Sequence, residues 1–437
     1  MEILIMAAQL LLGLSILVGV HEAGHMIAAK YFGMRVEKYS IGFPPKIWGF
    51  KKGETEYSIG AIPLGGFVKI SGMIDESLDT KDLNKTPEPW EFRAKPAWQR
   101  LIVMMGGIIV NLFIGVLISI FVLYIYGEKD FASIEVNKKG IVASSLARKI
   151  GLKTGDKIIA VNGKPYDKFH QLRDADVLLS DNSFYTVQRG DSVFDLKIPV
   201  GFIGELSKSD KEEFLAPISP FEVGNLVPGS NADKAGIQKG DKIIAINDTQ
   251  IQYLHELLET LPKFKDQKIN VKIERAGKVL TLPVQVDGNG RIGFEIHPLL
   301  KVQTQYYGFG QSIVKGTENA FSIITNTVRG FGKIFKGQVN ASDSVSGPLG
   351  IAKQYGPTWD WQRFWGLTGM LSMVLAFMNF LPIPALDGGH VMFLMYEMAA
   401  RRKPSDKFME VAQKIGMVLL LALMVFAFGN DIFKMFK

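Results

Sequence analysis

A charge-free, largely apolar stretch from Ile3 to Val20 opens the chain and leads directly into His21-Glu22-Ala23-Gly24-His25. A stretch of this length is sufficient for a helix that crosses a bilayer. The sequence therefore predicts a transmembrane helix over residues 1–30 with two histidines near its far end. No Lys or Arg precedes the apolar stretch, so we expect a retained helix rather than a cleaved signal peptide.

The spacing of the two histidines indicates a metal site. Residues four positions apart share one face of a helix, so His21 and His25 can bind one Zn²⁺, while Glu22 can act as general base. A pair of capping or interface histidines is the plainer alternative. Ionisable side chains beside an apolar stretch favour a functional site, because charges at membrane depth are rare. At 1.5 Å per residue, His21 lies about 27 Å from Ile3, which is close to the far side of the bilayer.

Composition restricts the class of protein and the metal ligands. The chain is 47% hydrophobic with a mean hydropathy of +0.14, as expected for membrane helices joined to soluble domains. It has no cysteine, which excludes disulfides and Cys-ligated zinc. The net charge of +7 is carried by basic residues that flank apolar segments, and no aromatic-basic motif accompanies them. We therefore expect no nucleic-acid partner.

Residues 31–100 form a basic loop, which the positive-inside rule assigns to the cytoplasm, with Met1 on the other side. Within it, residues 36–70 alternate in polarity and contain several Gly and Pro residues. This pattern predicts two or more short, membrane-associated strands or hairpins with an exposed edge. Such an edge could pair with an unwound substrate, with Gly65, Gly66 and Phe67 as contacts. A plain cytoplasmic hairpin loop is the alternative.

Three further apolar segments follow. The second span is predicted at 101–126, where Asn111 is expected to form an interhelical hydrogen bond. Residues 341–400 hold a linker and a third span that is broken around Asn379, Pro382 and Pro384, because proline removes backbone donors. Asp387 lies in this break and is the expected third zinc ligand, while a supporting or packing role is favoured for the neighbouring His390. A fourth span is predicted at 411–436.

The segment between the second and third spans contains a repeat. Residues 149–162 and 234–247 are identical at nine of fourteen positions, at an offset of 85. Each copy reads as a short helix, a Gly-Asp turn and a strand, which resembles the PDZ domain. We expect PDZ-like domains at 127–220 and 221–298, which typically bind peptides by strand addition. The carboxylate-binding loop would be Ile292-Gly293-Phe294 in the second copy and, more weakly, residues 202–205 in the first.

Residues 299–340 have apolar side chains at helical spacing, with basic residues between them. This pattern predicts one or two amphipathic helices on the membrane surface. Packing against the soluble repeat is the alternative. The predicted fold is therefore a polytopic α-helical membrane protein with four transmembrane helices, a membrane-associated β-hairpin region and two inserted PDZ-like α+β domains.

His-Glu-Ala-Gly-His in the first span, the paired repeats and the pattern Asn-x-x-Pro-x-Pro-x-Leu-Asp-Gly from Asn379 resemble the site-2 protease family of intramembrane metalloproteases. The resemblance covers nearly the whole chain. It implies one zinc per chain bound by His21, His25 and Asp387, with Glu22 as base and Asn379 in contact with substrate. Pro382 and Pro384 in the same break are expected substrate contacts as well.

The resemblance also implies a partner and a location. Substrates would be single-pass membrane proteins, such as an anti-sigma factor of an envelope stress response after an extracytoplasmic cut, or remnant signal peptides. The chain would lie in the bacterial inner membrane, with both termini and the PDZ-like domains periplasmic and the site near the cytoplasmic face. No stable protein partner is expected. A catalytically inactive, PDZ-bearing membrane scaffold is the alternative function.

Overall fold

The computed structural model describes residues 2–73, 86–208, 214–344 and 346–435. The chain divides into two compact units. Unit 1 comprises Met1–Gly127, Tyr306–Phe335 and Asn340–Lys437, and unit 2 comprises Glu128–Gln305 and Lys336–Val339. The soluble repeat thus forms a unit of its own, inserted between helices of unit 1.

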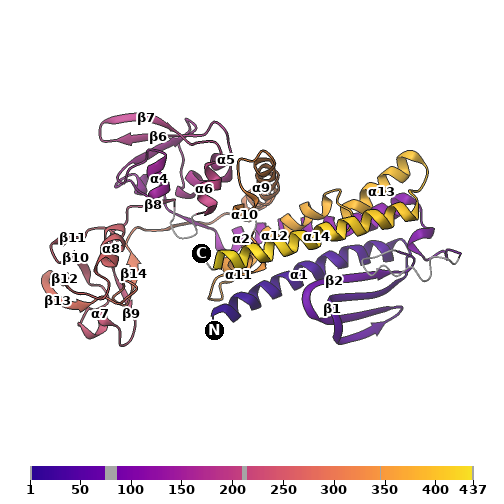
Figure 1. Ribbon diagram of the computed structural model, residues 1–437, viewed down its shortest axis with the longest axis horizontal. Coiled ribbons are helices and arrows are strands. Elements are labelled where there is room, and N and C mark those ends of the chain that lie inside the picture. Colours follow the sequence, from indigo (N-terminus) through magenta and orange to yellow (C-terminus); the bar gives the residue numbers. More distant parts are fainter. Residues whose placement is uncertain (1, 74–85, 209–213, 345, 436–437) are drawn as a thin grey trace. The chain divides into compact units, whose positions relative to one another are not determined.

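Helix α2 (Ala97–Tyr126) contacts four other helices of unit 1 (Figure 1). These are α1 (Glu2–Tyr31), α9 (Phe309–Phe335), α12 (Trp361–Phe380) and α13 (Asp387–Ala400). The other helical elements of this unit are η1 (Phe92–Ala94), α10 (Ala341–Ser344), α11 (Pro348–Tyr355) and α14 (Asp406–Met435).

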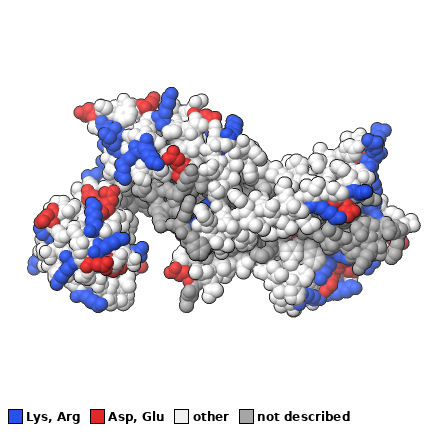
Figure 2. All heavy atoms as spheres, in the orientation of Figure 1, with Lys and Arg blue, Asp and Glu red and all other residues white. Residues whose placement is uncertain are grey.

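Three helical stretches in the described part of the chain are long and apolar enough to cross a membrane: Glu2–Tyr31, Ala97–Tyr126 and Lys407–Lys434. On the face in Figure 2, the helical part of unit 1 carries few charged side chains. Residues 381–386 divide the predicted third span into α12 and α13. The helix at Lys407–Lys434 corresponds to the predicted fourth span, whereas the third span, and with it the total of four, stays a prediction. Helices α2 and α14 begin a few residues earlier than the sequence predicts, at Ala97 and Asp406.

The predicted short strands form two long antiparallel strands, β1 (Val36–Lys52) and β2 (Thr55–Ile70). Tyr39 pairs with both Tyr57 and Val68, so the first half of β1 lies between the two halves of β2. Among the described residues, 66–70 therefore pair on one side only and form an edge. Val68 packs in a core with residues of α1 and α2, which holds this edge against the helices.

Each copy of the repeat in unit 2 has a separate hydrophobic core. The first copy pairs β5 with β6 and β7, and β4 with β8, whereas the second forms the sheet β11-β10-β12-β13 and pairs β14 with β9. Strand β3 pairs with β15 where the chain enters and leaves the unit. The elements of the first copy are β3 (Glu128–Asp130), α3 (Ser133–Val136), β4 (Ile141–Ala143), α4 (Ser145–Lys149), β5 (Lys157–Val161), η2 (Phe169–Arg173), α5 (Ala175–Leu178), β6 (Phe184–Arg189), β7 (Ser192–Lys197), α6 (Phe202–Lys208) and β8 (Leu215–Pro217). Those of the second are β9 (Phe221–Leu226), α7 (Asn231–Lys234), β10 (Lys242–Ile246), β11 (Thr249–Gln250), α8 (Leu254–Thr260), η3 (Leu261–Phe264), β12 (Lys268–Arg275), β13 (Lys278–Gln285), β14 (Phe294–Pro298) and β15 (Gln303–Gln305).

The Asp of each Gly-Asp turn is buried and forms a two-pronged ion pair. Arg189 binds both carboxylate oxygens of Asp156 at 2.7 Å, and Arg275 binds both of Asp241 at 2.6 Å. Each arginine also donates to the carbonyl oxygen of the glycine that follows the short helix before the turn, Gly151 or Gly236. The two copies therefore share this structural centre, although the sequence repeat does not include the arginines.

Several sequence expectations are corrected here. Residues 202–205 form the start of α6, with Phe202 buried against Phe214, so they are not a carboxylate-binding loop. Unit 2 extends to Gln305 because β15 pairs with β3. In the first copy, His170 Nδ1 lies 2.9 Å from Asp130 Oδ2, and this hydrogen bond raises the pKa of His170. By contrast, an amphipathic helix is found where the sequence predicts one or two, as α9, which packs on α2 and α12 within unit 1.

The Asp156–Arg189 pair generates a stability prediction. Asp156→Asn removes the charge of a side chain that is 1% exposed and leaves Arg189 without its partner, so we expect the first copy to lose about 2 kcal/mol. Hydrogen exchange measured on the full-length chain should show that the slowly exchanging amides of the first copy exchange roughly thirtyfold faster in the variant than in wild type. The second copy in the same chain is the internal control. Unchanged protection in residues 141–197 would contradict the prediction.

Candidate metal centre

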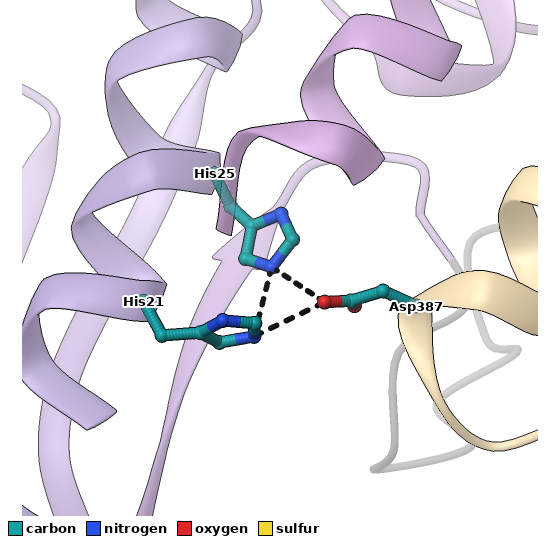
Figure 3. A group of neighbouring side chains, drawn as sticks. All are labelled: His21, His25 and Asp387. Carbon is teal, nitrogen blue, oxygen red and sulfur yellow. Dashed lines mark hydrogen bonds and ion pairs between the residues drawn. The ribbon is translucent and has the colours of Figure 1, made fainter. Parts of the chain in front are cut away.

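The two histidines of α1 and the first residue of α13 converge in unit 1 (Figure 3). Asp387 Oδ2 lies 3.1 Å from His21 Nε2 and 3.3 Å from His25 Nε2, and the two Nε2 atoms are 3.3 Å apart. His21 and His25 are buried, with exposed fractions of 9% and 5%. The structure thus brings together all three residues that the sequence predicts as metal ligands.

Hydrogen bonds on the far side of each imidazole ring orient the Nε2 atoms. His25 Nδ1 lies 2.8 Å from the carbonyl oxygen of Val103, which can only accept, so Nδ1 carries the proton. His21 Nδ1 lies 3.2 Å from the Asn111 amide. Turning that amide by 180° lets Oδ1, which is buried and without a partner among the described residues, accept the proton of His21 Nδ1. The predicted interhelical role of Asn111 is therefore found, and its partner is His21.

With a proton on the Nδ1 atom of each ring, the Nε2 atoms of His21 and His25 and the Oδ2 atom of Asp387 face one another with their lone pairs. Such an arrangement is repulsive unless a cation lies between them, and Asp387 Oδ2 has no other hydrogen-bond partner among the described residues. Ligand atoms bound to one tetrahedral Zn²⁺ at about 2.0–2.1 Å would lie about 3.3–3.4 Å from each other. The distances and the donor set therefore fit a zinc ion with three protein ligands.

Close helix contact brings the histidines up to α2. A Cβ atom on Gly24 would overlap the backbone of Gly106, and a Cβ atom on Gly106 would lie 2.6 Å from the carbonyl oxygen of Gly24. One residue further, a Cβ atom on Gly107 would lie 2.5 Å from His25 Nε2. Glycine at these positions therefore makes room for the helix crossing and for the two imidazole rings.

Asp387 is positioned by the turn that separates α12 from α13. Ala385 has φ of 78°, in the left-handed region that non-glycine residues seldom adopt. A Cβ atom on Gly388 would overlap the carbonyl oxygen of Leu381, and one on Gly389 would lie 2.7 Å from that of Ile383. Two glycines thus allow the chain to fold back on itself, so that Asp387 begins α13 facing the histidines.

The three residues line a cavity of about 580 Å³ together with several other predicted site residues. Glu22, Asn379, Gly66, Phe67 and His390 are among the lining residues. Asn379 Nδ2 lies 3.4 Å from His21 Nε2, so this side chain is next to the metal position. Edge residues 66–70 of β2 form one part of the cavity wall.

Gly65, Pro382 and Pro384, which the sequence also predicts as substrate contacts, do not line this cavity. A Cβ atom on Gly65 would overlap the ring of Phe43, which does line it. The prolines shape the turn instead, and Pro384 packs against Gly416 of α14.

Ile292, Gly293 and Phe294 lie in unit 2 at the start of β14 and are not among the residues that line this cavity. The Gly293 carbonyl accepts hydrogen bonds from the Val227 N–H and the Ser230 hydroxyl, and the Ile292 carbonyl accepts one from Ala232. These contacts fix the loop against the first turn of the second copy.

Sequence reasoning did not find Val103, Gly107 or Gln413 at the site. The carbonyl of Val103 carries no sequence signal, since every residue has one. Gln413 lines the cavity and is an uncharged polar residue in the long apolar helix α14, which is a signal that the sequence does contain.

Comparisons with known proteins agree with this geometry. The profile of Peptidase family M50 matches residues 9–423, which include all residues of the metal centre. The Regulator of sigma-E protease RseP of Escherichia coli is 30% identical over 455 residues, 97% of each chain. A Regulator of sigma E protease of Haemophilus influenzae is 28% identical over 97% of this chain and 98% of the relative. A Vibrio cholerae protein named as a zinc metalloprotease is 30% identical over 96% and 97%.

The packing of Gly107 against the histidines leads to a prediction. Gly107→Ala would place a methyl group against His25 Nε2, so we expect the purified variant to bind at least tenfold less zinc at limiting metal, because the ligand must move. Elemental analysis measures the zinc content. Gly115→Ala on the same helix is the matched control, since its Cβ would lie 2.5 Å from the Met373 sulfur and 3.3 Å from the Gly369 carbonyl oxygen but would meet no metal ligand. Equal zinc in both variants would count against the proposed ligand arrangement.

Proposed function

The chain belongs to peptidase family M50, and we propose that it is a zinc endopeptidase that cleaves the transmembrane segments of single-pass membrane proteins. The observation that carries the proposal is the convergence of two His Nε2 atoms and one Asp oxygen within 3.3 Å, beside Glu22 in the same cavity. The relative of Vibrio cholerae named as a zinc metalloprotease supports zinc as the metal.

A zinc ion at this site would act as a Lewis acid toward a peptide carbonyl and lower the pKa of water. Glu22 follows His21 in sequence, so it lies off the ligand face of α1 while still lining the cavity. It would take the proton of the attacking water and pass it to the leaving amine. Asn111 and the Val103 carbonyl would hold the histidines in the tautomer that leaves Nε2 free.

The edge of β2 supports an extended substrate. A helical peptide uses its own N–H and C=O groups, so a transmembrane substrate must unwind before it can be cut. Residues 66–70 have backbone groups on one side that pair with no described strand, and they lie beside the metal site. An unwound segment would pair there by strand addition. Asn379 would contact that segment next to His21.

Contacts within unit 1 support the proposed topology. At one end, Arg100 binds Glu397 at 2.5 Å and Lys403 donates to the Arg93 carbonyl, so the two basic segments of the sequence lie together. We assign this end to the cytoplasm. At the other end, Gln9 donates to the Gly356 carbonyl, and Asp431 of α14 accepts from Gly347. Both termini and unit 2 would then be periplasmic, in a bacterial inner membrane.

The relatives named as regulators of sigma E support an anti-sigma factor as one substrate, with remnant signal peptides as another. In this proposal the two copies of unit 2 are PDZ-like domains. Strand β14 pairs only with β9 among the described strands, so its other edge is open to a peptide, and Ile292-Gly293-Phe294 would bind the carboxylate. These domains would either recruit a substrate with a new C-terminus or exclude intact ectodomains.

The central test combines zinc analysis with cleavage of a single-pass model substrate. Wild type should bind one zinc per chain and cleave. Glu22→Gln should keep the zinc and lose cleavage by at least a hundredfold, because it removes the base. Asp387→Ala should lose both. Glu410→Gln, an exposed carboxylate of α14 that pairs with Lys414, is the control. If Glu22→Gln binds zinc and still cleaves, Glu22 is not the general base. If wild type binds no zinc and does not cleave, the chain is better explained as a catalytically inactive membrane scaffold.

A second test separates the two roles of unit 2. Glu128 and Gln305 are paired residues of β3 and β15, so a short Gly-Ser linker from Gly127 to Tyr306 can replace everything between them. If unit 2 excludes bulky ectodomains, the shortened chain should cleave an intact substrate that wild type leaves uncut. If it recruits, cleavage of the pre-cut substrate should fall about tenfold or more. Zinc content at the wild-type level is the control for folding of unit 1.

A further inference from the structure

The side chain of Gln413 in α14 is polar and lines the metal-site cavity, but it takes no part in the proposed binding of the metal or in the proposed catalysis. It is 7% exposed and lines the same cavity as His21, Glu22 and Asp387. Its surroundings on α14 are otherwise apolar or outward-facing: Glu410 and Lys414 form an exposed ion pair, and Val411, Ile415 and Val418 are exposed. Around Gln413, the charged and the large apolar side chains of α14 are thus exposed, whereas the uncharged polar side chain lines the cavity.

Two contacts fix α14 in this orientation. Gly416 lies one helical turn after Gln413, and a Cβ atom there would overlap the carbonyl oxygen of Pro384, so the helix touches the turn that carries Asp387. Near the other end of α14, Asp431 accepts hydrogen bonds from the backbone of Gly347, Leu349 and Gly350 at 2.9–3.0 Å. A rotation of α14 that turned Gln413 away from the cavity would break both contacts.

The Gln413 amide makes no hydrogen bond to any described residue, although a side-chain amide has two donors and an acceptor. Neither amide atom of Gln413 is among the fully enclosed polar atoms that lack a partner, so the amide is accessible from the cavity, where a bound molecule can replace water as its hydrogen-bond partner. A peptide group is the matching partner, because it offers one C=O and one N–H.

We propose that Gln413 is a substrate-binding residue, whose amide donates to a backbone C=O and accepts from a backbone N–H of the peptide at the metal site. This inference depends on the proposed peptidase function and adds a second point of main-chain binding to the β2 edge. A helical segment cannot bind Gln413 in this way, because its N–H groups are used within the helix. Gln413 thus favours substrate that has already unwound, and it does so without selecting side chains.

The first experiment measures steady-state cleavage by Gln413→Met, which keeps the size of the side chain and removes both hydrogen bonds. The probe is a single-pass model substrate with a Leu- and Ala-rich transmembrane helix and a central Gly-Ser pair. We expect KM to rise about tenfold, kcat to stay within about twofold and zinc content to be unchanged. Glu410→Gln should match wild type. Wild-type KM for Gln413→Met, or loss of its zinc, would overturn the inference.

The second experiment needs no turnover. The chain contains no cysteine, so Gln413→Cys in the Glu22→Gln background supplies a single thiol. We expect a disulfide with single cysteines placed within two residues of the substrate's cleavage point, and none from Glu410→Cys. If wild type cleaves the substrate but Gln413→Cys forms no cross-link, this inference is wrong and the proposed peptidase function still stands. A wild-type chain that cleaves no substrate would refute both.

Discussion

The convergence of three unprotonated atoms in a buried site is the constraint on which unit 1 depends. His21, His25 and Asp387 place lone pairs within 3.3 Å of one another, although Asp387 is far from the two histidines in sequence. Without a cation this arrangement would cost free energy through repulsion and lost hydration. The hydrogen bonds to Val103 and Asn111 support this arrangement, because they place the proton of each ring on Nδ1 and leave Nε2 free to bind a cation.

Small residues make the convergence possible. Gly24 and Gly106 allow α1 and α2 to touch through their backbones, and Gly388 and Gly389 allow the chain to fold back before α13. A Cβ atom at any of these positions would lie within 3 Å of backbone atoms of the neighbouring segment, so the elements would have to move apart. The glycines of unit 1 thus determine the site as directly as the ligands do, although none of them binds anything.

The metal centre could be predicted from the sequence because its signals are local or chemical. His21 and His25 share a helical face by spacing alone, and the proline-rich break drew attention to Asp387. Gly107 and Val103 could not be assigned to the site, since their roles arise from which helices lie together. Gln413 is recognisable in the sequence as a polar residue of an apolar helix, but its place at the site depends on the packing of α14. In unit 2, the repeat predicted two separate cores, whereas residues 202–205 formed α6 because Phe202 is buried against Phe214. A short sequence motif did not override that packing.

Polar contacts have a particular importance in this helical unit. Lipid is as apolar as the helix surfaces, so apolar packing alone gives little preference for one orientation of a transmembrane helix. Helix α14 illustrates the consequence: most of its apolar side chains are exposed, and its orientation is determined by Asp431 at one end and the Gly416–Pro384 contact near the other. Because Pro384 belongs to the turn that positions Asp387, the contact that orients α14 also supports the metal ligand. The wall of the cavity that carries Gln413 and the carboxylate that binds the metal are therefore placed by the same few residues.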